Sequence, residues 1–328
     1  MGMMRKGVIL AGRQATRAWV VCMVFGLIAL VATAACGGSS QPSSKPFPTV
    51  IPLGGCEVCP VITNSSLAVG ENRFSLGLLD EEVSPVLGAQ VQLRFFDLNG
   101  DEPLLKSEGP AQFIPMELFF IDEQAGKERR FVGENGVYVS QVNFDVPGRW
   151  GVEVNVTLDD RRLDPLRFQF DVHEESAEPG IGDPAPASRQ LTVADADISE
   201  IDSSFPLRPH MHDITITDAL ARGQPIVVAF ATPAFCESRT CGPVMDTVMD
   251  PLYEKYKDQA IFIHVEPYKL KELREGIALA PVEALQEWNL QTEPWVFVID
   301  KEGKIAGKFE GIVSMDEVES VLQRILEG

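Results

Sequence analysis

Apolar and polar residues alternate between about residues 65 and 172, a stretch that has no long helical period. Alternation with a period of two predicts half-buried β-strands, and turn-forming residues interrupt it at 98–101, 134–136, 147–148 and 159–160. The apolar sets that share a face are Phe74, Leu76 and Leu78; Val91, Leu93 and Phe95; Tyr138, Val142 and Phe144; Trp150, Val152, Val154 and Val156; and Phe168 and Phe170. Short strands with regular turns predict an all-β antiparallel sandwich over residues 61–172.

From residue 210 onward, continuous apolar runs alternate with helical stretches. The runs PIVVAFA (225–231) and AIFIHV (260–265) are typical of strands buried on both faces, and VFVID (296–300) with KIAGKFEG (304–311) predicts a hairpin. A short strand is expected to begin near His212. Helices are expected from Thr217, after Pro243, over 281–288, and from Ser314 to Leu326, where Ser314 and Glu317 form a capping box.

The N-terminus combines positive charge with a short apolar run. Arg5, Lys6, Arg13 and Arg17 precede the apolar residues 18–30, and small residues at 33–35 lead into Cys36. This layout predicts a secretory signal over 1–35. Small residues that end at a cysteine resemble a bacterial lipoprotein signal, although Thr33 stands where leucine is more usual. The resemblance implies that Cys36 is lipidated and anchors the chain to the cell membrane on its extracytoplasmic side. The alternative is an uncleaved anchor helix, for which the run is short.

Two segments have the composition of linkers. Residues 36–60 begin with GGSSQPSSKPFP, which predicts a flexible tether, and 173–209 form an acidic, proline-rich linker. The formal net charge is −20. Such an acidic chain argues against nucleic acid and anionic lipid headgroups as partners.

Cysteine usage is sparse and paired. Of six cysteines, Cys22 leaves with the signal and Cys36 carries the lipid, which leaves Cys56/Cys59 and Cys236/Cys241. Disulfides persist outside the cytoplasm, so both pairs are expected to be oxidised. The flanks of Cys56/Cys59 are loop-like, which favours a small structural disulfide. The alternative is a resolving pair that exchanges with the other cysteines.

The C-terminal cysteine turn carries a family resemblance. Its position between a buried strand and a helix, with TEP (292–294) before the hairpin, resembles the thioredoxin fold of thioredoxin, TlpA and Sco-like proteins. The resemblance implies an α/β domain over 210–328, with a central mixed sheet and flanking helices. It also implies thiol–disulfide exchange with a protein substrate, without a cofactor, and a cis-proline at Pro294 that faces the cysteines. Its expected substrate contacts are Pro233, Phe235 and Glu293. In addition, residues 67–80 and 136–156 are similar to YtkA-like immunoglobulin-like modules.

The cysteine spacing departs from that family, because Cys236 and Cys241 form C-x4-C rather than C-x-x-C. A regular helix would hold two such sulfurs apart, so the turn must bulge or the helix must start late. Two registers compete: Phe235-Cys236 supplies the attacking thiol, or Cys241-Gly242-Pro243 does. We favour attack by Cys236 and resolution by Cys241. Glu293 would place a carboxylate beside the sulfurs and raise thiol pKa, which favours a narrow partner or a slow disulfide.

Two other functions are compatible with the sequence. Sco-like proteins bind copper through two cysteines and a histidine, and the corresponding candidates here are Cys236, Cys241, His210 and His212. The second alternative is a non-catalytic lipoprotein whose disulfide is structural.

Overall fold

The structure is a computed structural model that describes residues 47–49, 55–122, 128–277 and 279–328. The predicted signal, Cys36 and most of the predicted tether lie outside the described residues. Within these ranges, every helix is too short or too polar to cross a membrane.

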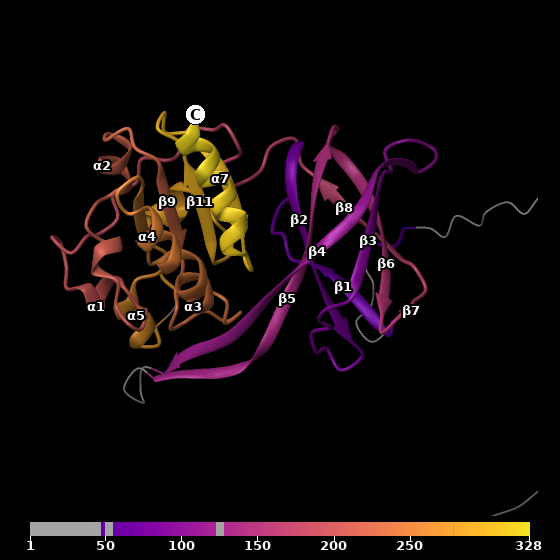
Figure 1. The fold of residues 1–328 in the computed structure, drawn as a ribbon, viewed down its shortest axis with the longest axis horizontal. Helices are drawn as coiled ribbons and strands as arrows, with labels where there is room; N and C mark the ends of the chain where they lie inside the picture. Colours follow the sequence, from indigo (N-terminus) through magenta and orange to yellow (C-terminus); the bar gives the residue numbers. More distant parts are fainter. Residues whose placement is uncertain (1–46, 50–54, 123–127, 278) are drawn as a thin grey trace, which may run out of the picture. The chain divides into compact units, whose positions relative to one another are not determined.

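An eight-stranded antiparallel sheet occupies the N-terminal half of the described chain (Figure 1). Its order is β1-β2-β5-β4-β3-β6-β7, and β8 pairs with β6. The alternation of the sequence explains its core, because the predicted inward residues, such as Phe74, Leu93 and Trp150, are completely buried. The strands are β1 (Val58–Ile62), β2 (Gly70–Asp80), β3 (Gln90–Asp97), β4 (Leu104–Asp122), β5 (Glu128–Phe144), β6 (Gly148–Leu158), β7 (Arg161–Arg162) and β8 (Leu166–Val172).

Strands β4 and β5 are much longer than their neighbours, at 19 and 17 residues, and stay paired as far as Asp122 and Glu128. We call residues 114–122 and 128–137, the distal part of this hairpin, the arm (Figure 1). Its buried residues Ile114, Met116 and Val137 belong to the hydrophobic core of the C-terminal sheet. The arm therefore packs on residues more than 70 positions further along the chain.

The C-terminal half contains a four-stranded mixed sheet of order β10-β9-β11-β12. Strand β9 pairs in parallel with β10 and antiparallel with β11, and β11 pairs antiparallel with β12. The strands are β9 (Ile226–Phe230), β10 (Ile261–Val265), β11 (Trp295–Ile299) and β12 (Ile305–Glu310). Their alternate residues enter two separate cores, so both faces are covered.

Most helices of this half are short. They are α1 (Ile198–Ile201), the 3-10 helix η1 (Pro209–Met211), α2 (Ile216–Leu220), α3 (Cys241–Val244), the π-helix η2 (Met245–Met249), α4 (Asp250–Tyr256), α5 (Leu270–Arg274), α6 (Glu283–Glu287) and α7 (Met315–Glu327). Ser314 caps α7 with Glu317 in the predicted capping box. The short strand expected near His212 is wrong, because residues 212–214 form bends between η1 and α2.

The predicted fold class, an immunoglobulin-like sandwich followed by an α/β thioredoxin-like domain with flanking helices, is wrong. The structure is mostly β, with 39% strand and 19% helix, and its N-terminal strands form one large curled antiparallel sheet. The physical reason lies in β4 and β5. Their apolar alternation continues into the arm, beyond the part that packs in the N-terminal core. The arm completes the core of the C-terminal sheet, whereas the prediction expected only helices of the C-terminal domain to cover that sheet.

Two other segments differ from a simple linker or loop. Residues 58–60, expected as part of the tether, belong to β1 and pair with β2. In the segment 173–209, Asp202 and Arg208 are buried, and the Ala185 N–H donates to the Gly303 carbonyl. Both segments therefore contribute to the packed structure.

Candidate functional site: the Cys236–Cys241 pair

The site lies where the central strand β9 ends. Val265 of β10 and Trp295 of β11 are both paired with Phe230, the last residue of β9. The residue after β10 is Glu266, and the residues before β11 are Glu293 and Pro294. The sheet therefore brings one glutamate to each side of the segment that follows Phe230.

A tight turn then separates the two cysteines. The N–H groups of Phe235 and Cys236 both donate to the Thr232 carbonyl, at 3.1 and 2.9 Å. Helix α3 begins at Cys241, so Cys236 lies in the turn and Cys241 in the first helical turn. Of the two arrangements expected for a C-x4-C pair, a bulged turn or a late helix start, the structure has the late helix start.

The two sulfurs are in direct contact. The Cys241 thiol donates to Cys236 Sγ across 2.6 Å, and the Cys241 N–H points to the same sulfur at 3.4 Å. The Ser238 hydroxyl shares a hydrogen bond with Cys236 Sγ at 3.1 Å and contacts the Thr240 hydroxyl at 2.7 Å. Three polar groups thus converge on the sulfur of Cys236. Both cysteines are thiols here, which differs from the expectation that this pair is oxidised.

This arrangement separates the two thiol pKa values. The hydrogen bond from Cys241, helped by Ser238 and by the backbone N–H groups of Thr240 and Cys241, lowers the pKa of Cys236 to about 6. Burial raises the pKa of Cys241 well above its ordinary value, and the hydrogen bond that it donates raises it further. A low-pKa thiolate is the reactive form of cysteine. Cys236 is therefore the nucleophile that the geometry favours.

Glu293 completes the group. Its carboxylate and the two sulfurs all lie within 4.8 Å of one another. Burial raises the pKa of Glu293, while the Tyr268 hydroxyl donates to its Oε2 at 2.8 Å. The expectation that Glu293 lies beside the sulfurs is confirmed. Its charge raises the pKa of Cys241, whereas the pKa of Cys236 is lowered because hydrogen bonds outweigh the effect of burial.

The arm covers the cysteines. Cys236 is 2% exposed and Cys241 is completely buried, and both belong to the core that contains Ile114 and Met116 of β4. A side chain at Gly242 would place its Cβ 2.7 Å from the Phe119 ring, which shows how closely β4 approaches α3. A partner must therefore reach Cys236 past the arm.

The remaining predicted contact residues are in the same region. Pro233 is buried in the turn, and Phe235 is half-buried directly before Cys236. Pro294 is buried and follows a cis peptide bond from Glu293. The structure thus collects the cysteines and the residues named for substrate contact at one end of the sheet.

The other cysteine pair is a disulfide. Cys56 and Cys59 are bonded, with their Cα atoms 5.4 Å apart, and Cys59 is completely buried in β1. The prediction of a disulfide at this C-x-x-C is confirmed.

The histidines of the copper alternative lie elsewhere. Among the described residues, the group of possible metal ligands around the cysteines contains Glu293 and no histidine. His210 packs on the ring of Tyr253, with centroids 4.2 Å apart. His212 contacts His264 at 3.1 Å, and both lie near the buried Asp202. The C-terminal sheet therefore does not assemble the predicted copper ligand set.

Sequence reasoning missed Asp202 and Glu266. Both are buried, and burial raises the pKa of Glu266 to about 8. An acidic residue directly after an apolar strand, as in IFIHVE, is the only local signal for Glu266. For Asp202 no local signal exists, since it lies in a segment with linker composition.

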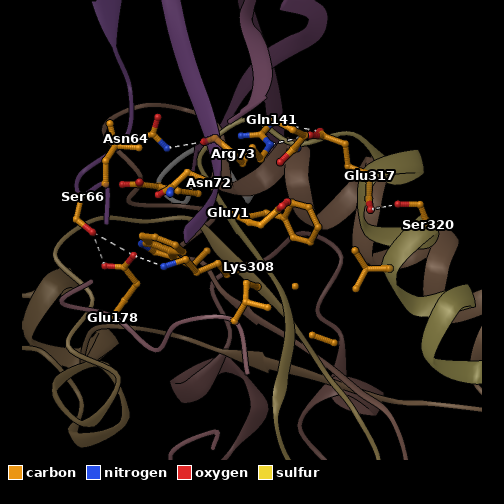
Figure 2. Close-up of a pocket in the computed structure, with 18 of the residues that line it drawn as sticks. Asn64, Ser66, Glu71, Asn72, Arg73, Gln141, Glu178, Lys308, Glu317 and Ser320 are labelled. Carbon is orange, nitrogen blue, oxygen red and sulfur yellow. Dashed lines mark hydrogen bonds and ion pairs between the residues drawn. The ribbon is translucent and has the colours of Figure 1, made fainter. Parts of the chain in front are cut away.

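A separate cavity of about 430 Å³ lies between β2, β12 and α7 (Figure 2). Arg73 pairs with Glu317 at 2.7 Å, and Lys308 pairs with Glu178 at 2.7 Å. Figure 2 shows that Ser66 also points to Glu178. Paired charges of both signs line this cavity, and no cysteine or histidine is among its described lining residues, so it offers no thiol for redox chemistry.

No protein-family model and no curated protein matches this chain.

Proposed function

We propose that this protein exchanges thiols and disulfides with a protein partner through Cys236 and Cys241. The observation that carries the proposal is the contact of the two sulfurs at 2.6 Å, with their pKa values shifted in opposite directions. Cys236 is the activated thiol, and Cys241 remains protonated until the second step. This asymmetry is what a two-step exchange requires.

The first step is attack on a partner disulfide. The Cys236 thiolate forms a bond to one partner sulfur, and the second partner sulfur leaves as a thiolate and takes up a proton. In the second step Cys241 loses its proton and attacks the Cys236 sulfur. The Cys236–Cys241 disulfide forms, the mixed disulfide breaks, and the partner receives two electrons in total. Run in reverse, the same steps oxidise the partner.

Glu293 supports the second step. Its carboxylate lies within 4.8 Å of both sulfurs, and burial raises its pKa. A carboxylate with a raised pKa is a better proton acceptor than an ordinary one. We assign to Glu293 the uptake of the proton that Cys241 releases. Phe235, half-buried beside Cys236, is the proposed contact for the partner chain.

We also propose a location for this protein. A lipid on Cys36 would hold the protein at the extracytoplasmic side of the cell membrane, where partner disulfides are available. Labelling cells with radioactive palmitate, with Cys36→Ser as the control, tests this part separately.

The chemistry is tested by trapping the intermediate. The Cys241→Ser variant, mixed with a small disulfide or oxidised insulin chains, is expected to accumulate a mixed disulfide on Cys236, detected by intact mass. The Cys236→Ser variant is expected to lose at least about 1000-fold of the exchange rate, because the thiol that remains has a raised pKa. The matched control is Cys56→Ser/Cys59→Ser, which leaves this pair intact. Equal trapping by both single variants contradicts the assigned roles.

The reduction potential tests the function itself. A value between about −120 and −270 mV lies in the range of working exchange proteins, whereas a value below about −300 mV indicates a structural disulfide. The second result would reject the proposal.

A further inference from the structure

A second buried cluster lies beside β9 and is separate from the cysteines. It consists of Asp202, in the segment after α1, His212, directly after η1, and His264 of β10. The exposed fractions of the His264 and Asp202 side chains are zero, and that of His212 is 2%. We propose that these three side chains bind a divalent transition-metal ion of the Zn²⁺ class, a role that goes beyond the thiol chemistry proposed above.

The donor atoms lie within about 0.2 Å of the spacing of metal ligands. His212 Nε2 lies 3.1 Å from His264 Nδ1, and these two nitrogens lie 3.7 and 3.6 Å from the nearer oxygens of Asp202. In tetrahedral zinc sites with bonds of about 2.0–2.2 Å, neighbouring ligand atoms are about 3.3–3.6 Å apart. The Asp202 carboxylate is too far from both nitrogens for a hydrogen bond. Only the two histidines of this cluster are hydrogen-bonded to each other.

Outer contacts orient each ligand. His264 Nε2 lies 2.9 Å from the Ala231 carbonyl, and only a protonated Nε2 can donate to it, which leaves Nδ1 with a free lone pair. Asp202 Oδ1 accepts from the Ser204 N–H and Oδ2 from the Arg208 N–H, both at 2.7 Å. Ligand histidines whose second nitrogen donates to a carbonyl, and ligand carboxylates that are themselves hydrogen-bonded, are characteristic of metal sites.

The protonation states also suit a metal. Both side chains are buried, and burial disfavours a charged imidazole. Neutral imidazole is the form that coordinates a metal ion. His212 must then carry its proton on Nδ1 instead of donating from Nε2, and that shift is available to any neutral imidazole.

A cavity borders the cluster. A cavity of about 710 Å³ is lined by His212, His264 and Glu266 together with residues of α5 and α6. Glu266 Oε2 accepts from the Ser203 N–H, while its buried Oε1 makes no hydrogen bond among the described residues. Three protein ligands and an open side correspond to a site that keeps one coordination position for water or a small ligand.

Metal binding is tested in the full chain that carries Cys236→Ser and Cys241→Ser, because thiols are themselves metal ligands. Co²⁺ is the spectroscopic probe and Zn²⁺ the competitor. We expect one equivalent of Co²⁺ to give the visible bands of a four-coordinate nitrogen and oxygen site without a thiolate charge-transfer band, and Zn²⁺ to abolish them. Because both thiols are absent, this result is independent of the proposed exchange function.

His212→Gln is expected to weaken Co²⁺ binding by at least about 100-fold, since removal of outer contacts alone costs about 10- to 100-fold. The matched control is His210→Gln, two residues away and outside the cluster, which should bind as the parent does. Equal affinity of these two variants, or no Co²⁺ bands in the parent, would overturn the proposal and leave a hydrogen-bonded histidine pair. If His212→Gln does not fold, long-range ¹H–¹⁵N spectra of the parent decide: Zn²⁺ must shift Nε2 of His212 and Nδ1 of His264.

Discussion

The cysteine cluster and the histidine cluster lie at the ends of neighbouring strands, and both are buried, yet their electrostatics differ. The two thiols contact each other directly, and hydrogen bonds move the pKa of Cys236 down while burial moves that of Cys241 up. The histidines His212 and His264 are both shifted down, because burial dominates for each. Burial alone therefore produces neutral ligands, whereas burial with directed hydrogen bonds produces an activated nucleophile.

The contacts that hold the cysteine cluster also differ from those that hold the histidine cluster. The sulfur of Cys236 is contacted by the Ser238 hydroxyl and by the thiol and N–H of Cys241, and Cys236 shares a hydrophobic core with side chains of the arm. Asp202, at the centre of the histidine cluster, is held by backbone N–H groups that belong to the fold itself. We infer that the cysteine cluster tolerates substitution and that the histidine cluster does not.

The largest expected effect on stability follows from this contrast. Asp202→Ala removes the acceptor of two buried N–H groups, which should lower the free energy of unfolding by about 3 kcal/mol. Asp197→Ala, an exposed N-cap in the same segment, should cost about 1 kcal/mol or less, and Cys236→Ser about 1 kcal/mol. Urea unfolding monitored by circular dichroism measures all three. A cost for Asp202→Ala no greater than that for Asp197→Ala would remove the structural distinction between the clusters.

The next effect is the pH dependence of thiol reactivity. The Cys236 thiolate is the form that alkylates, and its pKa is lowered to about 6, so the rate should rise with pH and reach half its plateau near pH 6. Between about pH 5 and pH 7 the rate with iodoacetamide should increase about tenfold. Mass spectrometry of the reduced chain measures it, and Cys236→Ser is the control, in which Cys241 should react slowly at both pH values. A midpoint near that of an ordinary thiol would mean that the turn does not activate Cys236.

The smallest effect tests the cover over the cysteines. Gly242→Ala places a methyl group against the Phe119 ring, so it should loosen the arm at a cost of about 1 kcal/mol. We expect alkylation of Cys236 to become about two- to threefold faster, in proportion to the added opening. Gly109→Ala, on β4 with no atom within 4 Å of its added Cβ, is the control for an alanine in the same strand.

Combining Gly242→Ala with Phe119→Ala removes the clash and should restore stability relative to Phe119→Ala alone. An unchanged alkylation rate in Gly242→Ala would mean that the arm does not limit access to the cysteines.

Local features of this protein were determined by its sequence. Alternation predicted the inward residues of β2, β3 and β6, continuous apolar runs predicted β9 and β10, and the capping box predicted the start of α7. The reach of a C-x4-C pair required either a bulged turn or a late helix start, and the helix starts late, at Cys241. Each of these depends on residues close together in the chain, whose geometry is set by backbone conformation and helical or strand period.

Only the tertiary structure decided what covers each face. Alternation indicates that one side of β4 and β5 is buried, but not that their distal half packs on the C-terminal sheet, and for this reason the fold class was predicted wrongly. Likewise His264 lies more than 50 positions from His212 and Asp202 in the chain, and strand pairing and the packing of the segment around Asp202 bring the three together. A hydrophobic period in the sequence indicates that one face of an element is buried. Which segment covers that face depends on the packing of the whole chain.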